Sequence, residues 1–194
     1  AAAAVVRGWS NRMNVAPHTV WANLHLEAMS NRTTSCRVVG VCTAGQESTE
    51  AAAMVAAVGV NASSTSLFTK TFLDSMQFLG GGTTSPRQGW AAGSDVLTHM
   101  TTPISQALVQ VIADRAQSGR AGVAILDPLT GAVQSKAPNA TALPWRRHLC
   151  DIQWYLSMPD HPNAAMITAA YNWIDQGHQA VAPVSAGGYV NYLE

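Results

Sequence analysis

Four short segments of this 194-residue sequence have the composition or spacing of β-strands. Residues 20–28 and 147–156 alternate polar and apolar side chains, which is the period-two pattern of strands with one buried face. Residues 37–43 are rich in β-branched side chains, and residues 122–127 form an apolar run that predicts a buried strand. In the last strand, the alternation places Leu149, Asp151, Gln153 and Tyr155 on one face and Cys150, Ile152 and Trp154 on the other.

Segments with helical signals lie between these strands. Thr102-Pro103 opens the clearest helix, which keeps apolar side chains on one face up to Gly119. The other predicted helices are residues 2–9, residues 51–60 with Ser48 as N-cap and Gly59 and Asn61 at the end, and residues 163–181; residues 63–82 are predicted to be a flexible connection. Strands interleaved with helices, several at hairpin-like spacing, predict an α+β fold with an antiparallel sheet covered by helices on one face.

The sequence carries little charge for a chain that suits one domain. Charged residues make up 11% of it, against about 25% in a typical soluble domain, and the 11 basic and 11 acidic side chains cancel. Without a basic cluster, the chain lacks what phosphate binding requires, which excludes nucleic acid as its main partner. No apolar run approaches the roughly 20 residues of a membrane span. A charge-poor surface therefore suggests that the chain is part of something larger.

Cysteines and glycosylation sequons leave the compartment open. The cysteines are Cys36, Cys42 and Cys150, and the sequons begin at Asn31, Asn61 and Asn139. Either all three cysteines are small buried thiols, which we favour, or Cys36 and Cys42 form a disulfide. The sequons permit secretion without establishing it, and residues 1–6 do not form a complete signal peptide. Secreted and cytoplasmic locations both stay open.

Other candidate sites have ordinary structural explanations. The histidines are scattered without metal-ligand spacing, and no nucleophile elbow supports Ser/His/Asp catalysis. The segment Trp145-Arg146-Arg147-His148 has two interpretations: it binds a carboxylate or phosphate, or, as we favour, it anchors the sheet edge through one ion pair. We expect no metal site, and we expect the tryptophans to fill the core and pocket walls.

The C-terminal Tyr189-Val190-Asn191-Tyr192 is the most informative stretch. It supplies two phenols and one amide directly after Gly187-Gly188, and glycines allow the backbone to approach another surface closely. Phenols suit work beside a planar cofactor, because they pack a ring and pass a proton. From chemistry alone, we favour the alternative of a C-terminal strand whose tyrosines cap a core.

Four motifs together resemble the berberine-bridge-enzyme-like flavoproteins of the vanillyl-alcohol-oxidase superfamily. They are Thr130-Gly131, the TALPWR segment at 141–146, Ile152-Gln153, and the closing YVNYLE at 189–194. The resemblance implies an FAD-linked oxidoreductase that oxidises an alcohol, either a sugar or a secondary metabolite, by hydride transfer to flavin with O2 as the reoxidant. It implies that residues 1–160 are part of the substrate-binding domain and that residues 161–194 form a C-terminal segment that packs on the FAD domain.

The resemblance also implies roles for single residues. Tyr192 is the expected base near the substrate hydroxyl, with Tyr189 beside it. Asn191 is expected on the flavin side with Tyr189, while Gln153 and Tyr155 line the substrate pocket. An unperturbed tyrosine has a pKa near 10, so Tyr192 acts as a base only if neighbours lower that pKa or the proton leaves in concert with hydride.

The sequence departs from the family pattern at several points. Ser135 and Lys136 stand where many members have a carboxylate, so either the tyrosines act without an acid or the activity is altered. Trp145 replaces a histidine, and Glu194 replaces an aspartate. No phosphate-binding loop is present, so the FAD domain, in the same protein or a companion chain, is the expected partner and this chain alone should bind FAD poorly. The rival hypotheses are a cofactor-free α+β binding module and a non-catalytic family member.

Overall fold

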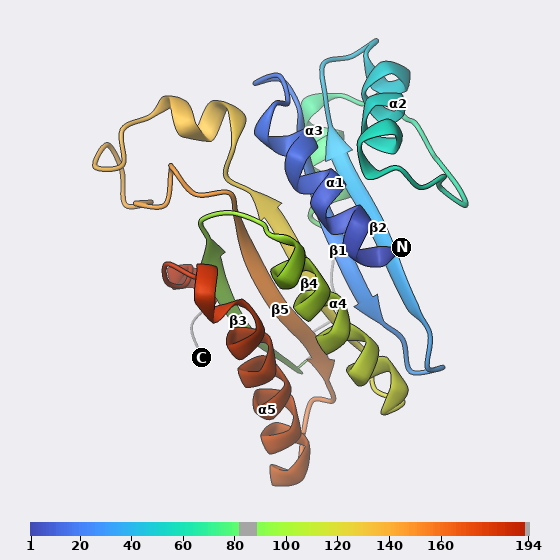
Figure 1. The fold of residues 1–194 in the computed structure, drawn as a ribbon, viewed down its shortest axis with the longest axis vertical. Helices are drawn as coiled ribbons and strands as arrows, with labels where there is room; N and C mark the ends of the chain where they lie inside the picture. Colours follow the sequence, from blue (N-terminus) through green and yellow to red (C-terminus); the bar gives the residue numbers. More distant parts are fainter. Residues whose placement is uncertain (82–88, 193–194) are drawn as a thin grey trace.

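A computed structural model describes residues 1–81 and 89–192 of the chain. Five strands form one antiparallel sheet in the order β2-β1-β4-β5-β3 (Figure 1). The strands are β1 Trp21–Ala28, β2 Thr34–Val41, β3 Gly89–Leu97, β4 Gly122–Pro128 and β5 Cys150–Met158. The helices are α1 Ala2–Asn14, α2 Glu47–Val58, α3 Phe72–Leu79, α4 Thr102–Gln117 and α5 Ala164–Val181, with short 3-10 helices η1 Gly131–Ser135, η2 Ala182–Val184 and η3 Val190–Tyr192.

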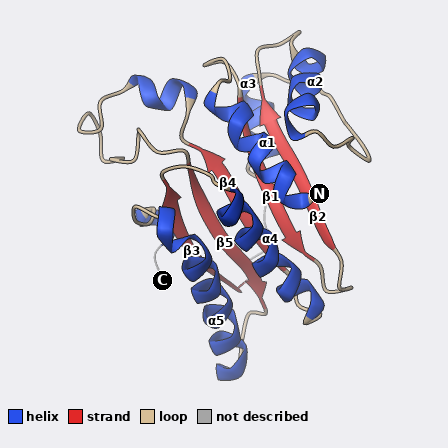
Figure 2. Cartoon of the chain, viewed as in Figure 1, coloured by secondary structure: helices blue, strands red, loops and turns tan. Residues whose placement is uncertain are grey.

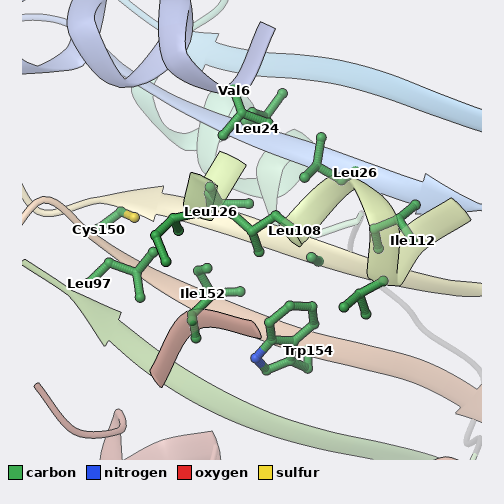
Figure 3. Close-up of a cluster of buried hydrophobic side chains, with 14 of the residues drawn as sticks. Val6, Leu24, Leu26, Leu97, Leu108, Ile112, Leu126, Cys150, Ile152 and Trp154 are labelled. Atoms are coloured by element: carbon green, nitrogen blue, oxygen red, sulfur yellow. The ribbon is translucent and has the colours of Figure 1, made fainter. Parts of the chain in front are cut away.

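Helices α1, α4 and α5 cover one face of this sheet, as Figure 2 shows. The alternation of the strands determines which side chains they meet: in β1, every second residue is buried. Between the helices and the strands, Leu24, Leu126 and Ile152 pack in one apolar cluster that also holds Leu108 of α4 (Figure 3). The predicted α+β fold, an antiparallel sheet with helices on one face, is confirmed.

The predicted helices all form, but some of them begin at other residues than predicted. Helix α4 begins as expected, with the Thr101 side chain accepting a hydrogen bond from the Ile104 amide, and α5 begins after the Asn163 cap. The predicted N-cap at Ser48 is wrong, because α2 already starts at Glu47 and Ser48 lies inside it. The predicted flexible connection at 63–82 is also wrong in part, because α3 forms there behind a Thr71 cap. Gly82 lies outside the described residues.

Strand β3 was not predicted, and its burial explains why. Its residues from Ala91 to Leu97 are buried without alternation, so the segment has no period-two pattern. Helix α5 covers one side of β3, and the chain after α5 pairs along its edge. The amide of Ala186 donates to the Val96 carbonyl at 2.8 Å, and the amide of Val96 donates to the Gly187 carbonyl at 2.6 Å. A strand enclosed in this way carries mostly small or apolar side chains, and its one charged side chain, Asp95, is held by hydrogen bonds.

Two further expectations, on the cysteines and on the C-terminal tyrosines, change with the structure. All three cysteines are free, and only Cys150 is buried, so the preferred picture of three buried thiols is wrong for Cys36 and Cys42 and no disulfide joins them. Tyr192 ends the 3-10 helix η3 and Tyr189 lies in the loop just before it, so the alternative of a C-terminal strand is wrong. Within the described ranges, no helix has the length and apolar character needed to cross a membrane.

The expected ion pair of the Trp145–His148 segment is wrong as well. Arg146 instead donates to the Val133 carbonyl at 3.3 Å and to Thr141 Oγ1 at 2.6 Å. Among the described residues, neither Arg146 nor Arg147 takes part in a salt bridge. Arg146 therefore ties its own loop together rather than the sheet edge.

Candidate active site

The face of the sheet opposite α1, α4 and α5 carries polar side chains at its centre. On β5 this face presents Asp151, Gln153 and Tyr155, while Ile152 and Trp154 point to the helices. The two faces predicted for this strand are therefore confirmed from Cys150 to Tyr155, whereas Leu149 precedes β5 and is buried in the core cluster. The register places three side chains of β4, Val123, Ile125 and Asp127, beside those of β5, and three of β3, Ala92, Ser94 and Val96, on the other side.

The C-terminal segment is held on this open face by Ser94. The Tyr189 amide donates to Ser94 Oγ at 2.7 Å, and that hydroxyl lies 3.3 Å from the Tyr189 carbonyl, to which it donates. Two glycines make this approach possible. A Cβ on Gly188 would lie 3.1 Å from the Ser94 carbonyl oxygen, and Gly187, at φ 149°, has room for no side chain beside the Trp145 ring. The close approach predicted from the glycines is thus made to the chain's own sheet.

The two tyrosines of the closing motif form one unit. Their ring centroids are 5.3 Å apart, and the rings meet edge to face. The side-chain amide of Asn191 donates to the Tyr189 hydroxyl at 2.7 Å. Asn191 therefore orients Tyr189, and its expected position beside a flavin stays a prediction. Both tyrosine rings are half-buried, so each presents part of its ring outward.

Two carboxylates lie below this unit, and the sequence analysis assigned chemistry to neither. Asp127 and Asp151 are directly opposite each other in neighbouring strands. Burial raises the pKa of Asp127 in spite of a hydrogen bond from Asn23. Burial, and then the charges of Asp127 and Asp95, raise the pKa of Asp151 to about 7. Oδ1 of Asp151 is buried and has no hydrogen-bond partner within the described chain.

These carboxylates also act on Tyr192. Burial raises the pKa of its phenol, and the charges of Asp127 and Asp151 and the neighbouring Tyr189 raise it further. Within this chain, the neighbours of Tyr192 therefore raise its pKa rather than lower it, and its role as a base stays a prediction. At neutral pH the phenol keeps its proton. It accepts another group's proton only in a concerted step in which its own proton leaves for an acceptor such as a neighbouring carboxylate.

The structure places the five predicted residues in two groups. Gln153 is opposite Ser94, the residue that holds Tyr189, so Gln153 and the tyrosine unit share one part of the face. Tyr155 lies two residues farther along β5 and stacks on Trp90, with ring centroids 6.4 Å apart. Trp90 is 54% exposed, so of the expected places, core or pocket wall, it does not lie in the core. Tyr155 thus belongs to the same face but to its outer part.

The missing carboxylate had a signal in the sequence. Asp127 lies one residue before the end of the apolar strand β4, and Asp151 occupies the polar face of β5. The two carboxylates meet only because β4 and β5 are antiparallel neighbours. Their register places Asp127 opposite Asp151, just as it places Ile125 opposite Gln153. Ser135 left two alternatives open, tyrosines that act without an acid or an altered activity, and both stay predictions, although two carboxylates lie near Tyr192. In the described part of the chain, no group of His, Cys, Asp and Glu side chains has a metal-binding arrangement.

Solved structures share this fold over essentially the whole chain. A BBE-like protein from Arabidopsis thaliana matches 100% of it at a TM-score of 0.76 and 15% identity. The chain has a berberine bridge enzyme-like fold. A variant of berberine bridge enzyme in complex with (S)-reticuline matches 100% of the chain at a TM-score of 0.77 and 11% identity, and chitooligosaccharide oxidase matches 98% at 0.76 and 18%. The resemblance inferred from the motifs is confirmed at the level of the fold.

The chain corresponds to less than half of each of these proteins. It spans 43% of the Arabidopsis thaliana protein, 41% of the berberine bridge enzyme variant and 43% of chitooligosaccharide oxidase. No protein-family model and no curated protein matches the sequence. The similarity is therefore one of structure.

Proposed function

We propose that this chain is the substrate-domain portion of an FAD-dependent oxidoreductase that oxidises an alcohol, with O2 as the reoxidant. The observation that carries the proposal is the half-buried pair Tyr189 and Tyr192 over two facing carboxylates, the half-buried Asp127 and the buried Asp151, on the uncovered face of the sheet. The fold supports it, because similar structures include an oxidase and a variant described as a reticuline dehydrogenase. The substrate is a sugar or a secondary-metabolite alcohol.

The open face has features that fit a flavin and a substrate. The tyrosine unit offers ring edges and one amide-oriented hydroxyl to a planar ring system. Asp151 Oδ1, below this unit, is a buried oxygen without a hydrogen-bond partner in the described chain. Tyr189 and Asn191 would contact the flavin from this chain. When bound, FAD supplies the hydride acceptor. Residues 1–160 would form part of the substrate-binding domain, and residues 161–194 would pack on the FAD domain, in the same protein or a companion chain.

Proton movement on this face follows from the raised pKa values. Oxidation of an alcohol releases one hydride and one hydroxyl proton. Tyr192 takes the hydroxyl proton while its own phenolic proton passes to the carboxylate pair Asp127 and Asp151, so the charge on the substrate oxygen never fully develops. Asp127 and Asp151 resist holding two negative charges, because they face each other in a site where Asp151 is buried and Asp127 half-buried, and therefore accept a proton readily. Gln153, with Tyr155 farther out, would line the substrate pocket.

Two measurements on the protein that contains this chain test the proposal. The first is an absorbance spectrum of native material with its intact mass, where we expect a flavin band near 450 nm. The second is anaerobic addition of sugars and secondary-metabolite alcohols, where we expect one of them to bleach that band. Absence of flavin would favour a cofactor-free binding module. Flavin that no alcohol bleaches would favour a non-catalytic relative.

A further inference from the structure

A buried carboxylate on the helix side of β3 connects three elements. Asp95 is 6% exposed, and its Oδ2 accepts hydrogen bonds from Trp154 Nε1 at 2.9 Å and from His178 Nδ1 at 2.6 Å. Its Oδ1 accepts a hydrogen bond from Ser185 Oγ at 2.8 Å. One side chain therefore connects the core strand β5, helix α5 and the segment that follows η2. Such charge-assisted bonds are stronger than neutral ones.

The segment bound to Asp95 leads directly to the tyrosine unit. After Ser185, the backbone of residues 186 and 187 pairs with Val96 at the edge of β3. The chain then passes to the open face, where Ser94 holds Tyr189. Ser94 and Asp95 are consecutive, and their side chains point to opposite faces because strand residues alternate. Together they hold the segment from both sides of the sheet edge.

The charge of Asp95 is maintained in spite of its burial. Burial alone raises the pKa of this carboxyl, but hydrogen bonds from His178, Trp154 and Ser185, together with the charge of His178, hold it below its usual value. Asp95 in turn contributes to raising the pKa of Asp151 on the open face. The groups facing this network are thus His178 of α5, Trp154 of β5 and Ser185, with Asp151 across the sheet.

We propose that Asp95, acting through Ser185, is a positioning residue that sets where Tyr189 and Tyr192 stand on the open face. The inference rests on the proposed function for its catalytic meaning, but the placement of the segment is a property of this chain alone. Trp154 and His178 fix the Asp95 carboxylate from the core and from α5. The hydrogen bond from Ser185 to Asp95 fixes the start of the segment on the helix side. The hydrogen bond from the Tyr189 amide to Ser94 fixes its end on the open face.

Hydrogen exchange in the whole protein tests the placement. We expect Asp95→Ala to increase the exchange rates of the Ala186 and Tyr189 amides by about tenfold or more, since the bond that fixes the segment is lost. Asp95→Ala also leaves buried donors unpaired and can unfold the protein. Ser185→Ala keeps the Trp154 and His178 bonds to Asp95, so it isolates the contact to the segment.

A second readout separates positioning from a general loss of stability. In Ser185→Ala, the phenol pKa of Tyr192 should fall toward its ordinary value, because a displaced phenol leaves the burial and the carboxylates that raise it. Ultraviolet titration measures this pKa, and the difference between the spectra of the wild type and Tyr192→Phe identifies the Tyr192 signal. The matched control is Asp175→Ala on the exposed side of α5, which should change neither readout.

The outcomes distinguish this inference from the proposed function. Faster exchange at Ala186 and Tyr189 with a lowered Tyr192 pKa supports positioning by Asp95, even if the protein holds no flavin and oxidises no alcohol. Wild-type exchange and a wild-type Tyr192 pKa in folded Ser185→Ala overturn it, even if the protein is an active oxidase. In an active protein, Ser185→Ala should lower the rate of flavin reduction while KM changes less.

Discussion

The two faces of this sheet are built from the same strands and do different things. On the helix side, Ile152 and Trp154 of β5 are fully buried among apolar neighbours. On the other side, Asp151 and Gln153 alternate with them and meet a carboxylate, a serine hydroxyl and the C-terminal tyrosines. The stability of the fold therefore depends on Ile152 and Trp154, and the proposed chemistry depends on Asp151 and Gln153, which alternate with them along β5.

The comparison also shows what burial means on each side. Burial of apolar side chains under α4 and α5 stabilises the fold. Burial of Asp127 and Asp151 on the open face opposes it, because each charged carboxylate loses its water. Two facing carboxylates that have lost water lower the free energy of unfolding of the domain. The same two groups are the proton acceptors of the proposed site.

The largest expected effect is on the helix side. Trp154→Ala removes a ring that contacts Trp173 edge to face and an N–H that binds Asp95. We expect a loss of about 3–5 kcal/mol in the free energy of unfolding, from the cavity and the lost packing. Urea denaturation followed by circular dichroism measures it. A loss below about 1 kcal/mol would show that this face does not carry the stability of the fold.

A smaller effect on the same side comes from added volume. Gly177 of α5 lies against the Trp154 ring, and a Cβ there would stand 2.5 Å from ring atoms. We therefore expect Gly177→Ala to cost about 1–3 kcal/mol by overpacking, although alanine favours a helix. The control is Gln179→Ala, at an exposed position two residues along the helix. Unchanged denaturation of Gly177→Ala would contradict the close packing of α5 on β5.

On the open face, the expected effect depends on pH. The pKa of Asp151 rises from 3.8 to about 7 on folding, so its protonated form stabilises the fold fully below pH 3.8 and this contribution is lost as pH rises through 7. Asp151→Asn stays neutral throughout. We expect it to be more stable than the wild type by about 1–2 kcal/mol at pH 8, with little difference at pH 4. Thermal denaturation at both values tests this, and equal stability at pH 8 would contradict it.

The smallest expected effect is at Gln153. Its side chain is half-buried on the open face and packs into no apolar core. Gln153→Ala should change the free energy of unfolding by less than about 0.5 kcal/mol while weakening substrate binding in the whole protein. Denaturation and KM are measured together on Gln153→Ala. The change in stability is then compared with that of Trp154→Ala, at the next residue of the strand. A destabilisation comparable to that of Trp154→Ala would mean that the two faces are not divided by role.

Local patterns predicted the elements whose burial is one-sided. The alternation in β1 and β5, Thr102-Pro103 at the start of α4 and residues 163–181 for α5 all correspond to observed elements. Strand β3 had no such pattern, because the C-terminal segment and α5 enclose it from both sides. A period-two pattern arises where one face of a strand is buried and the other is exposed to solvent. From Ala91 to Leu97, both faces of β3 are buried, so the pattern does not arise.

The candidate site divides in the same way. Tyr189, Tyr192 and Gln153 were found because a motif or an alternation marks them in the chain. Asp127 and Asp151 were not assigned a role, because 24 residues separate them and only the register of β4 and β5 makes them a pair. Asp95 was missed for a related reason, since its three partners come from β5, α5 and the segment after η2.

The rate of anaerobic flavin reduction in Tyr192→Phe tests the central claim most directly. Tyr171→Phe is the matched control, because that tyrosine lies exposed on α5, away from the open face. With the whole protein and a substrate that bleaches the wild type, we expect Tyr192→Phe to reduce flavin about 10²–10⁴-fold more slowly, as for loss of a positioned proton acceptor, while Tyr171→Phe keeps the wild-type rate. Flavin reduction by Tyr192→Phe at the wild-type rate would contradict the assignment of the open face as the catalytic face.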